Sequence, residues 1–212
     1  VVYASDHGDQ LGERGLWWKQ TFYDHSVAIP MIMRWPGRLP AGARRRQVVN
    51  LLDLAATMSD ALDAPALPQG QGRSLLGIAK DGGAPWLDET FAEYCTDGVA
   101  RWTGAAPVQQ RMVRYGRFKL VYYHRQRPQL FDLEADPDET TDLADTPGHQ
   151  TIREALIDRV LDGWDPEAIA LQMARKTTSK QLLSAWAKAV KPAEQHLWEV
   201  KMADNWLDEL PS

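Results

Sequence analysis

The sequence predicts an α/β fold in which the end of an α/β core precedes a small α+β subdomain and a helical tail. Two apolar segments, 1–4 and 28–35, precede a helical pattern. Several short alternating segments follow between residues 84 and 133, and helical periodicity returns after residue 148. We therefore expect three parts, at residues 1–83, 84–162 and 163–212.

The first part is expected to contain two strands and a helix. Residues 1–4 are typical of a short buried strand that leads into a charged loop with three glycines. Pro30 is tolerated at the start of the second strand, where a missing N–H costs little. The helix should begin behind Asn50, a suitable capping residue. Its apolar residues recur at helical spacing: Leu51, Leu54, Ala55, Met58 and Leu62.

The second part is expected to form an antiparallel sheet with one covering helix. Short strands are predicted at 90–94, 111–114, 118–123 and 129–133, with a hairpin turn at Gly116. Apolar residues of segment 148–161 share one helical face, which predicts the helix that covers the sheet. They are Ile152, Leu156, Ile157, Val160 and Leu161.

The tail has helical periodicity from residue 165 up to Pro192. The apolar positions are Ile169, Met173, Leu182, Leu183, Trp186 and Val190. Together with Trp198 and Trp206 they predict that the tail packs on something larger, either the body of the protein or a neighbouring subunit. A homo-oligomer assembled through this tryptophan-rich tail is one of the partners we consider.

The composition is that of a globular protein, with 25% charged and 44% hydrophobic residues. No apolar run approaches the roughly 18 residues of a membrane span, so no membrane partner is expected. A net charge of -5 argues against nucleic acid. Cys95 is the only cysteine, so no internal disulfide can form. The chain begins inside an apparent strand without a Met, which is typical of a fragment. Without the N-terminus, the sequence does not distinguish a cytoplasmic from a periplasmic location.

The end of the first strand holds the strongest candidates for chemistry. Asp6 and His7 bring a carboxylate and an imidazole side by side, and both groups are competent metal ligands. Such dipeptides are common, so a hydrogen-bonded core role for His7 is the alternative. Lys19 follows the glycine loop and could neutralise negative charge on an ester during its cleavage.

Three segments carry a family resemblance, in family order. They are VVYASDHGDQLGERGLWWKQTFYDHSVAIPMIMRWPG, VVNLLDLAATMSDALDAPALPQGQGRSLLGI and RMVRYGRFKLVYYHRQRPQLFDLEADPDETTDLAD. Together they resemble the C-terminal part of sulfatases in the alkaline phosphatase superfamily, particularly the branch of choline sulfatases and phosphonate monoester hydrolases. The resemblance implies the end of an alkaline phosphatase-like α/β core and covers most of residues 1–160.

The resemblance also implies roles for individual residues. Asp6 and His7 match positions that hold a divalent metal, with Ca²⁺ expected first and Mn²⁺ or Zn²⁺ as alternatives. Lys19 matches a lysine that contacts sulfate or phosphate oxygens. His25 matches a histidine of choline sulfatases, which favours sulfate esters; a substrate-binding role and a structural role are the alternatives for it. Independently of the resemblance, Trp18, beside Trp17, could line a substrate pocket, because an aromatic face suits a quaternary ammonium group. Packing explains the two tryptophans equally well.

The family nucleophile, a formylglycine made from Cys or Ser in C/S-x-P/A-x-R, is expected in a missing N-terminal part. Cys95 lies in YCTDG, which lacks that motif, so no nucleophile is expected in this chain. The N-terminal half of the same enzyme is therefore an expected partner, and the fragment alone is expected to be inactive. Asp53, Arg73 and Asp132 are interpreted as capping and turn residues.

These observations together predict the C-terminal portion of a metal-dependent sulfatase that acts on small-molecule sulfate esters. A phosphonate or phosphate ester hydrolase of the same superfamily is the first alternative. The second is a non-catalytic binding or assembly module.

Overall fold

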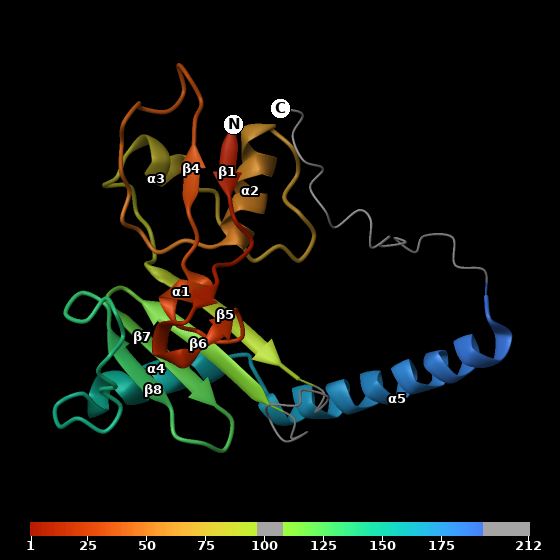
Figure 1. Ribbon diagram of the computed structural model, residues 1–212. Coiled ribbons are helices and arrows are strands. Elements are labelled where there is room, and N and C mark those ends of the chain that lie inside the picture. Colours follow the sequence, from red (N-terminus) through yellow and green to blue (C-terminus); the bar gives the residue numbers. More distant parts are fainter. Residues whose placement is uncertain (97–107, 193–212) are drawn as a thin grey trace, which may run out of the picture. The chain divides into compact units, whose positions relative to one another are not determined.

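A computed structural model describes residues 1–96 and 108–192 of the chain (Figure 1). By internal contacts, the chain divides into one unit at Val1–Met173 and another at Ala174–Ser212. Strands and helices alternate irregularly, as expected for a mixed fold. The predicted boundaries at 83/84 and 162/163 remain a prediction.

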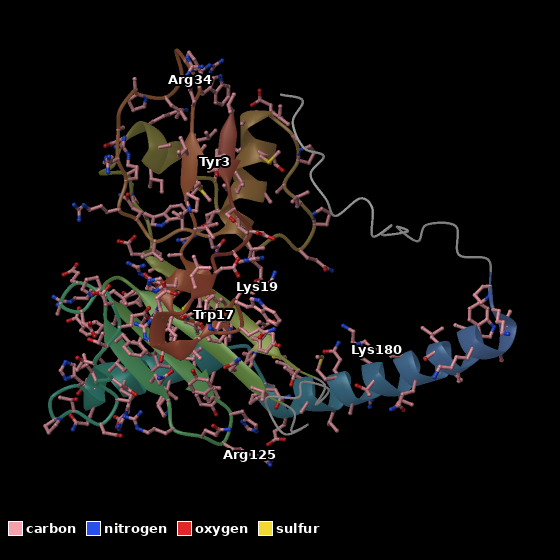
Figure 2. The ribbon with its side chains drawn as sticks, in the orientation of Figure 1. Tyr3, Trp17, Lys19, Arg34, Arg125 and Lys180 are labelled. Atoms are coloured by element: carbon pink, nitrogen blue, oxygen red, sulfur yellow. The ribbon has the colours of Figure 1, made fainter. Side chains whose placement is uncertain are left out.

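The first two expected strands form a separate two-stranded sheet. Strand β1 (Val2–Ala4) pairs antiparallel with β4 (Met31–Met33), and Tyr3 lies opposite Ile32. The prediction that residues 1–4 are buried is wrong, because the Tyr3 side chain is 62% exposed (Figure 2). Val2 and Met33 line a groove with residues of the following helix, whereas Tyr3 and Ile32 are among the most exposed apolar residues described.

Helix α2 (Leu51–Ala61) begins behind Asn50 as predicted. The Asn50 Oδ1 atom accepts hydrogen bonds from the backbone N–H groups of Leu52 and Asp53, at 2.8 and 3.1 Å. The Asp53 carboxylate accepts the Asn50 N–H in return, which completes a capping box, and also accepts the N–H of Arg73 at 2.8 Å. Asp53 is therefore a capping residue, as expected. A short helix, α3 (Leu76–Lys80), follows and was not predicted.

A four-stranded antiparallel sheet forms the second part. Its strands lie in the order β5 (Glu89–Cys95), β6 (Gln109–Tyr115), β7 (Phe118–Tyr123) and β8 (Gln129–Asp132). Gly116 joins β6 to β7 with a φ of 55°, in the left-handed region that favours glycine. Next to this turn, Asp132 accepts hydrogen bonds from Arg117 and from two backbone N–H groups, which confirms its turn role.

Helix α4 (Gln150–Leu161) covers one face of this sheet, as predicted (Figure 1). Alternate residues of the strands face it, because successive side chains of a strand point to opposite sides. The buried cluster on this face contains Val113, Leu120, Leu130, Ala144, Leu156 and Val160.

The opposite face is covered by a segment from the first part of the chain. Phe22 packs on Met112 and Val121 there, with Val27 at the edge of the cluster. Val27 ends a short helix, α1 (Asp24–Val27). The segment that carries Lys19 is thus attached to the small sheet, which the sequence had not indicated.

The tail forms one long helix, α5 (Pro166–Val190), in agreement with the predicted periodicity. Apolar side chains of its second half are exposed: Leu182, Leu183, Trp186 and Val190. Trp198 and Trp206 lie outside the described residues. Within residues 1–96 and 108–192, no helix is both long and apolar enough to traverse a bilayer.

Candidate active site

The loop after β1 is locked against helix α1 by a close backbone approach. The Gly8 N–H donates to the Ser26 carbonyl oxygen at 2.9 Å. A Cβ atom on Gly8 would lie 2.1 Å from the His25 carbonyl oxygen, so only glycine fits. This contact fixes the position of Asp6 and His7 at the end of the strand.

The His7 ring is oriented so that one nitrogen is available as a ligand. Nδ1 lies 2.8 Å from the Gly8 carbonyl oxygen, which can only accept, so Nδ1 carries the proton. In a neutral ring the lone pair is then on Nε2. The Asp6 Oδ2 atom lies 3.4 Å from Nε2, while Oδ1 accepts the His7 backbone N–H at 3.0 Å.

This arrangement fits two ligands of one metal ion. Two atoms that each lie about 2.1–2.3 Å from an ion, at right-angle to tetrahedral geometry, are about 3.0–3.8 Å apart. The 3.4 Å between Oδ2 and Nε2 falls in that range. No group of three or more His, Cys, Asp or Glu residues that could hold a metal occurs in the described part of the chain. Asp6 and His7 therefore fit as part of a ligand set.

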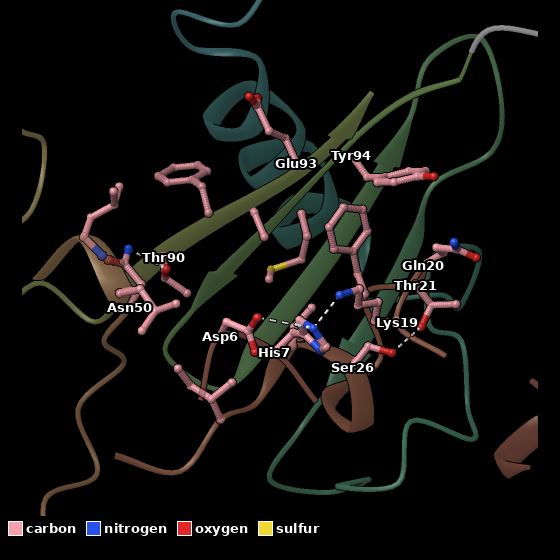
Figure 3. A pocket seen from close by; sticks show the side chains of 18 of the residues that line it. Asp6, His7, Lys19, Gln20, Thr21, Ser26, Asn50, Thr90, Glu93 and Tyr94 are labelled. Atoms are coloured by element: carbon pink, nitrogen blue, oxygen red, sulfur yellow. Dashed lines mark hydrogen bonds and ion pairs between the residues drawn. The ribbon is translucent and has the colours of Figure 1, made fainter. Parts of the chain in front are cut away.

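Lys19 returns to this pair through a short hairpin. Strand β2 (Gln10–Leu11) pairs with β3 (Trp17–Trp18), and Lys19 follows immediately. The Lys19 Nζ atom lies 2.5 Å from His7 Nε2, to which it donates (Figure 3). The structure thus brings together Asp6, His7 and Lys19, and we call these three residues the corner.

The corner opens into a cavity of about 350 Å³. Polar side chains of the corner, of residues 20, 21 and 26 and of Asn50 line part of it, and Phe22, Phe91 and Met112 supply apolar wall (Figure 3). A cationic lysine beside a mixed polar and apolar wall suits a small anionic ester.

His25 and Trp18 do not line this cavity. The His25 side chain is exposed on α1, near the Glu13 carboxylate. The pKa of Glu13 is lowered chiefly by the backbone N–H of Leu11 and to a smaller extent by the His25 ring. Trp18 is 67% exposed and has a φ of 69°. Their substrate-binding roles remain predictions.

A buried ion cluster that the sequence did not reveal holds the corner segment to the sheet. Lys119 lies on β7 with its side chain fully buried, and its Nζ donates to the Phe22 carbonyl at 2.9 Å and to Asp24 Oδ1 at 2.6 Å. It also pairs with the Glu139 carboxylate. Glu139 Oε2 in turn accepts the Asp24 backbone N–H at 2.6 Å. We call Asp24, Lys119 and Glu139 the clamp.

Tyr23, which lies between Phe22 and Asp24, is also held in place, through contacts of its ring. Its ring centre lies 4.1 Å from the Arg14 guanidinium carbon and 5.9 Å from the Phe131 ring centre. Arg14 also donates to the Asp138 carbonyl. Residues 22–24 are therefore fixed to the sheet through side-chain and backbone contacts.

Cys95 has none of the features of an activated nucleophile. It is partly buried at the end of β5, and burial raises the pKa of its thiol. A raised pKa reduces the thiolate fraction, which is the reactive form.

Comparison with known proteins gives a consistent match. The family described as N-sulphoglucosamine sulphohydrolase, C-terminal, matches residues 12–164. A choline-sulfatase of Rhizobium meliloti (strain 1021) is 34% identical over 179 residues, which cover 79% of this chain and 32% of the relative. Arylsulfatase K of Mus musculus is 32% identical over 157 residues, 68% of this chain and 26% of that protein.

A solved structure also resembles the chain. The phosphonate monoester hydrolase SpPMH from Silicibacter pomeroyi superposes with a TM-score of 0.67 and 28% identity, covering 77% of this chain and 34% of that one. The chain thus spans about a third of the length of these relatives or less.

Proposed function

The chain belongs to the N-sulphoglucosamine sulphohydrolase C-terminal family, and from this premise we propose that it is the C-terminal portion of a metal-dependent sulfatase. Its substrates would be small-molecule sulfate esters. The convergence of Asp6, His7 and Lys19 on one cavity is the observation that supports this proposal most strongly.

Asp6 and His7 would contribute two ligands to the divalent ion. Ca²⁺ is our first expectation, and the imidazole keeps Mn²⁺ or Zn²⁺ open. A bound divalent ion polarises an ester oxygen and stabilises the charge that develops there. Lys19 would place its ammonium group against the non-bridging oxygens, where it balances negative charge in the transition state.

The nucleophile, a formylglycine, would be provided by the N-terminal half of the same enzyme. Exposure of Tyr3 and Ile32 on the two-stranded sheet supports such a partner, because an apolar sheet face is normally covered. The remaining ligands of the metal would come from that half as well.

Hydrolysis of phosphonate or phosphate esters is the second candidate, because SpPMH is a phosphonate monoester hydrolase. Sulfate and phosphonate monoesters present similar tetrahedral centres to a metal and a lysine. An assembly module that uses the exposed apolar side chains of α5 is the candidate from another class.

The proposal is tested by the rate with which the full-length protein hydrolyses 4-nitrophenyl sulfate and 4-nitrophenyl phenylphosphonate, with Ca²⁺ or Mn²⁺ added. We expect a higher kcat/KM for the sulfate ester. Faster cleavage of the phosphonate would favour the second candidate. A rate no higher than that of buffer for both esters would favour the assembly module.

A further inference from the structure

A short chain of hydrogen bonds leads from a buried amide to the cavity wall. Gln10, on β2, is fully buried, and its Nε2 donates to Thr21 Oγ1 at 2.8 Å. Thr21 Oγ1 lies 3.0 Å from Ser26 Oγ. Thr21, Ser26 and Lys19 all line the cavity, and Figure 3 shows the bond between the hydroxyls of Thr21 and Ser26.

The hydroxyls of Thr21 and Ser26 carry one proton more than the hydrogen bonds among Gln10, Thr21 and Ser26 use. Each hydroxyl has a single proton to donate. One of the two protons lies in the bond between Thr21 and Ser26, and the Gln10 amide supplies its own. Among the described residues, neither hydroxyl has a hydrogen-bond partner beyond these contacts. One hydroxyl proton therefore remains for an acceptor in the cavity.

The contacts favour Ser26 as the residue that offers this proton. Thr21 Oγ1 already has two polar neighbours, Gln10 Nε2 and Ser26 Oγ, whereas Ser26 Oγ has one. Donation by Gln10 also polarises the Thr21 hydroxyl and makes it a better donor to Ser26.

We propose that the Ser26 hydroxyl donates a hydrogen bond to an oxygen of the tetrahedral oxyanion that Lys19 binds. This assignment rests on the proposed function, because it takes the sulfuryl group as the ligand of the cavity. A hydrogen bond to a charged oxygen is stronger than one between neutral groups. Gln10 and Thr21 act as positioning residues, since they orient the Ser26 hydroxyl without contacting the substrate.

The test compares Ser26→Ala with Thr21→Val in the full-length protein. Both substitutions break the same internal hydrogen bond, but only Ser26→Ala removes the proposed donor. We expect Ser26→Ala to lower kcat/KM for 4-nitrophenyl sulfate by about 10- to 100-fold. It should also raise the inhibition constant of inorganic sulfate. Thr21→Val removes a positioning contact but keeps the donor, so it should lower kcat/KM and weaken sulfate inhibition by clearly less than Ser26→Ala, about threefold to tenfold. The melting temperature of Thr21→Val should fall at least as far as that of Ser26→Ala, because the substitution also leaves the buried Gln10 amide without its acceptor.

Equal losses of kcat/KM in the two variants would show that the hydroxyls serve the fold alone and would overturn the assignment. Wild-type rates in Ser26→Ala would overturn it as well. Both outcomes leave the proposed function intact if the wild-type protein hydrolyses the ester. Failure of the wild type itself would contradict the proposed function. In that case, dissociation constants for inorganic sulfate, measured by calorimetry, that are equal in Ser26→Ala and wild type would count against Ser26 independently.

Discussion

The corner and the clamp each place a lysine ammonium beside polar partners, but their surroundings differ. In the corner, the side chains of His7 and Asp6 are 32% and 81% exposed. In the clamp, those of Lys119 and Glu139 are 0% and 1% exposed, and that of Asp24 is 29% exposed. The Lys119 ammonium has three donors and three acceptors around it. In the corner, the lone pair of His7 Nε2 accepts from the exposed Lys19, and Asp6 Oδ2 has room for another partner.

This difference distinguishes a cluster that holds the fold together from a group of side chains that can bind a ligand. The buried Lys119 ammonium finds all of its partners inside the protein, so it has no need of a ligand and keeps residues 22–24 in one place. An exposed group of potential ligands can exchange its lysine contact for a metal ion or an anion. The comparison teaches that the lysine buried in the sheet serves the structure and that the exposed lysine serves the proposed chemistry.

The largest effect on stability is expected for Lys119→Met. The substitution would leave the buried Glu139 carboxylate beside Asp24 without the lysine, while Arg114 remains 3.8 Å from Asp24. Breaking a buried ion pair in this way costs about 3–5 kcal/mol. Urea denaturation of the chain measures the change in the free energy of unfolding. The matched variant Lys19→Met, at the exposed lysine, should change it by less than about 1 kcal/mol. Equal losses for both lysines would break the distinction between clamp and corner.

For activity, the order of the two lysines reverses. In the full-length protein, Lys19→Ala should lower kcat/KM for a sulfate ester by about 10²- to 10³-fold, because one charge-stabilising group is lost. Its melting temperature should stay close to that of the wild type. Retained turnover would remove Lys19 from the mechanism.

A smaller effect is expected from an ion pair whose arginine is more exposed than any group of the clamp. The pKa of Asp132 is lowered from its ordinary value of 3.8, and the hydrogen bond from Arg117 is the largest cause. A lowered pKa in the folded state stabilises the fold above pH 3.8, and this contribution is lost as the pH falls below that value. The melting temperature of the wild type should therefore approach that of Arg117→Met between pH 6 and about pH 3. A constant difference over this range would contradict the assignment.

Local patterns in the sequence predicted the elements that depend on neighbouring residues. The Asn50 cap, the Gly116 turn and the apolar face of α4 each follow from residues a few positions apart. The meeting of Asp6, His7 and Lys19 was also accessible, since a glycine-rich loop of a dozen residues joins them.

The clamp could not be predicted in this way, because its contacts join distant residues. Lys119 meets Asp24 across 95 positions, and Asp24 meets Glu139 across 115. The only local signal is a lysine on the same strand face as Val121, inside an otherwise apolar strand. The exposure of β1 was missed for a related reason: burial of a strand depends on what packs against it, which an apolar run does not reveal.

Calcium and manganese binding by the full-length protein tests the central claim most directly. Asp6→Ala should weaken the affinity for the metal by at least about 10- to 100-fold, since even the loss of a residue that supports a ligand has an effect of that size. Asp9→Ala, which removes an exposed carboxylate of the same loop outside the cavity, should leave the affinity unchanged. An Asp6→Ala protein that binds both ions as tightly as the wild type would contradict the assignment of the corner as a metal site.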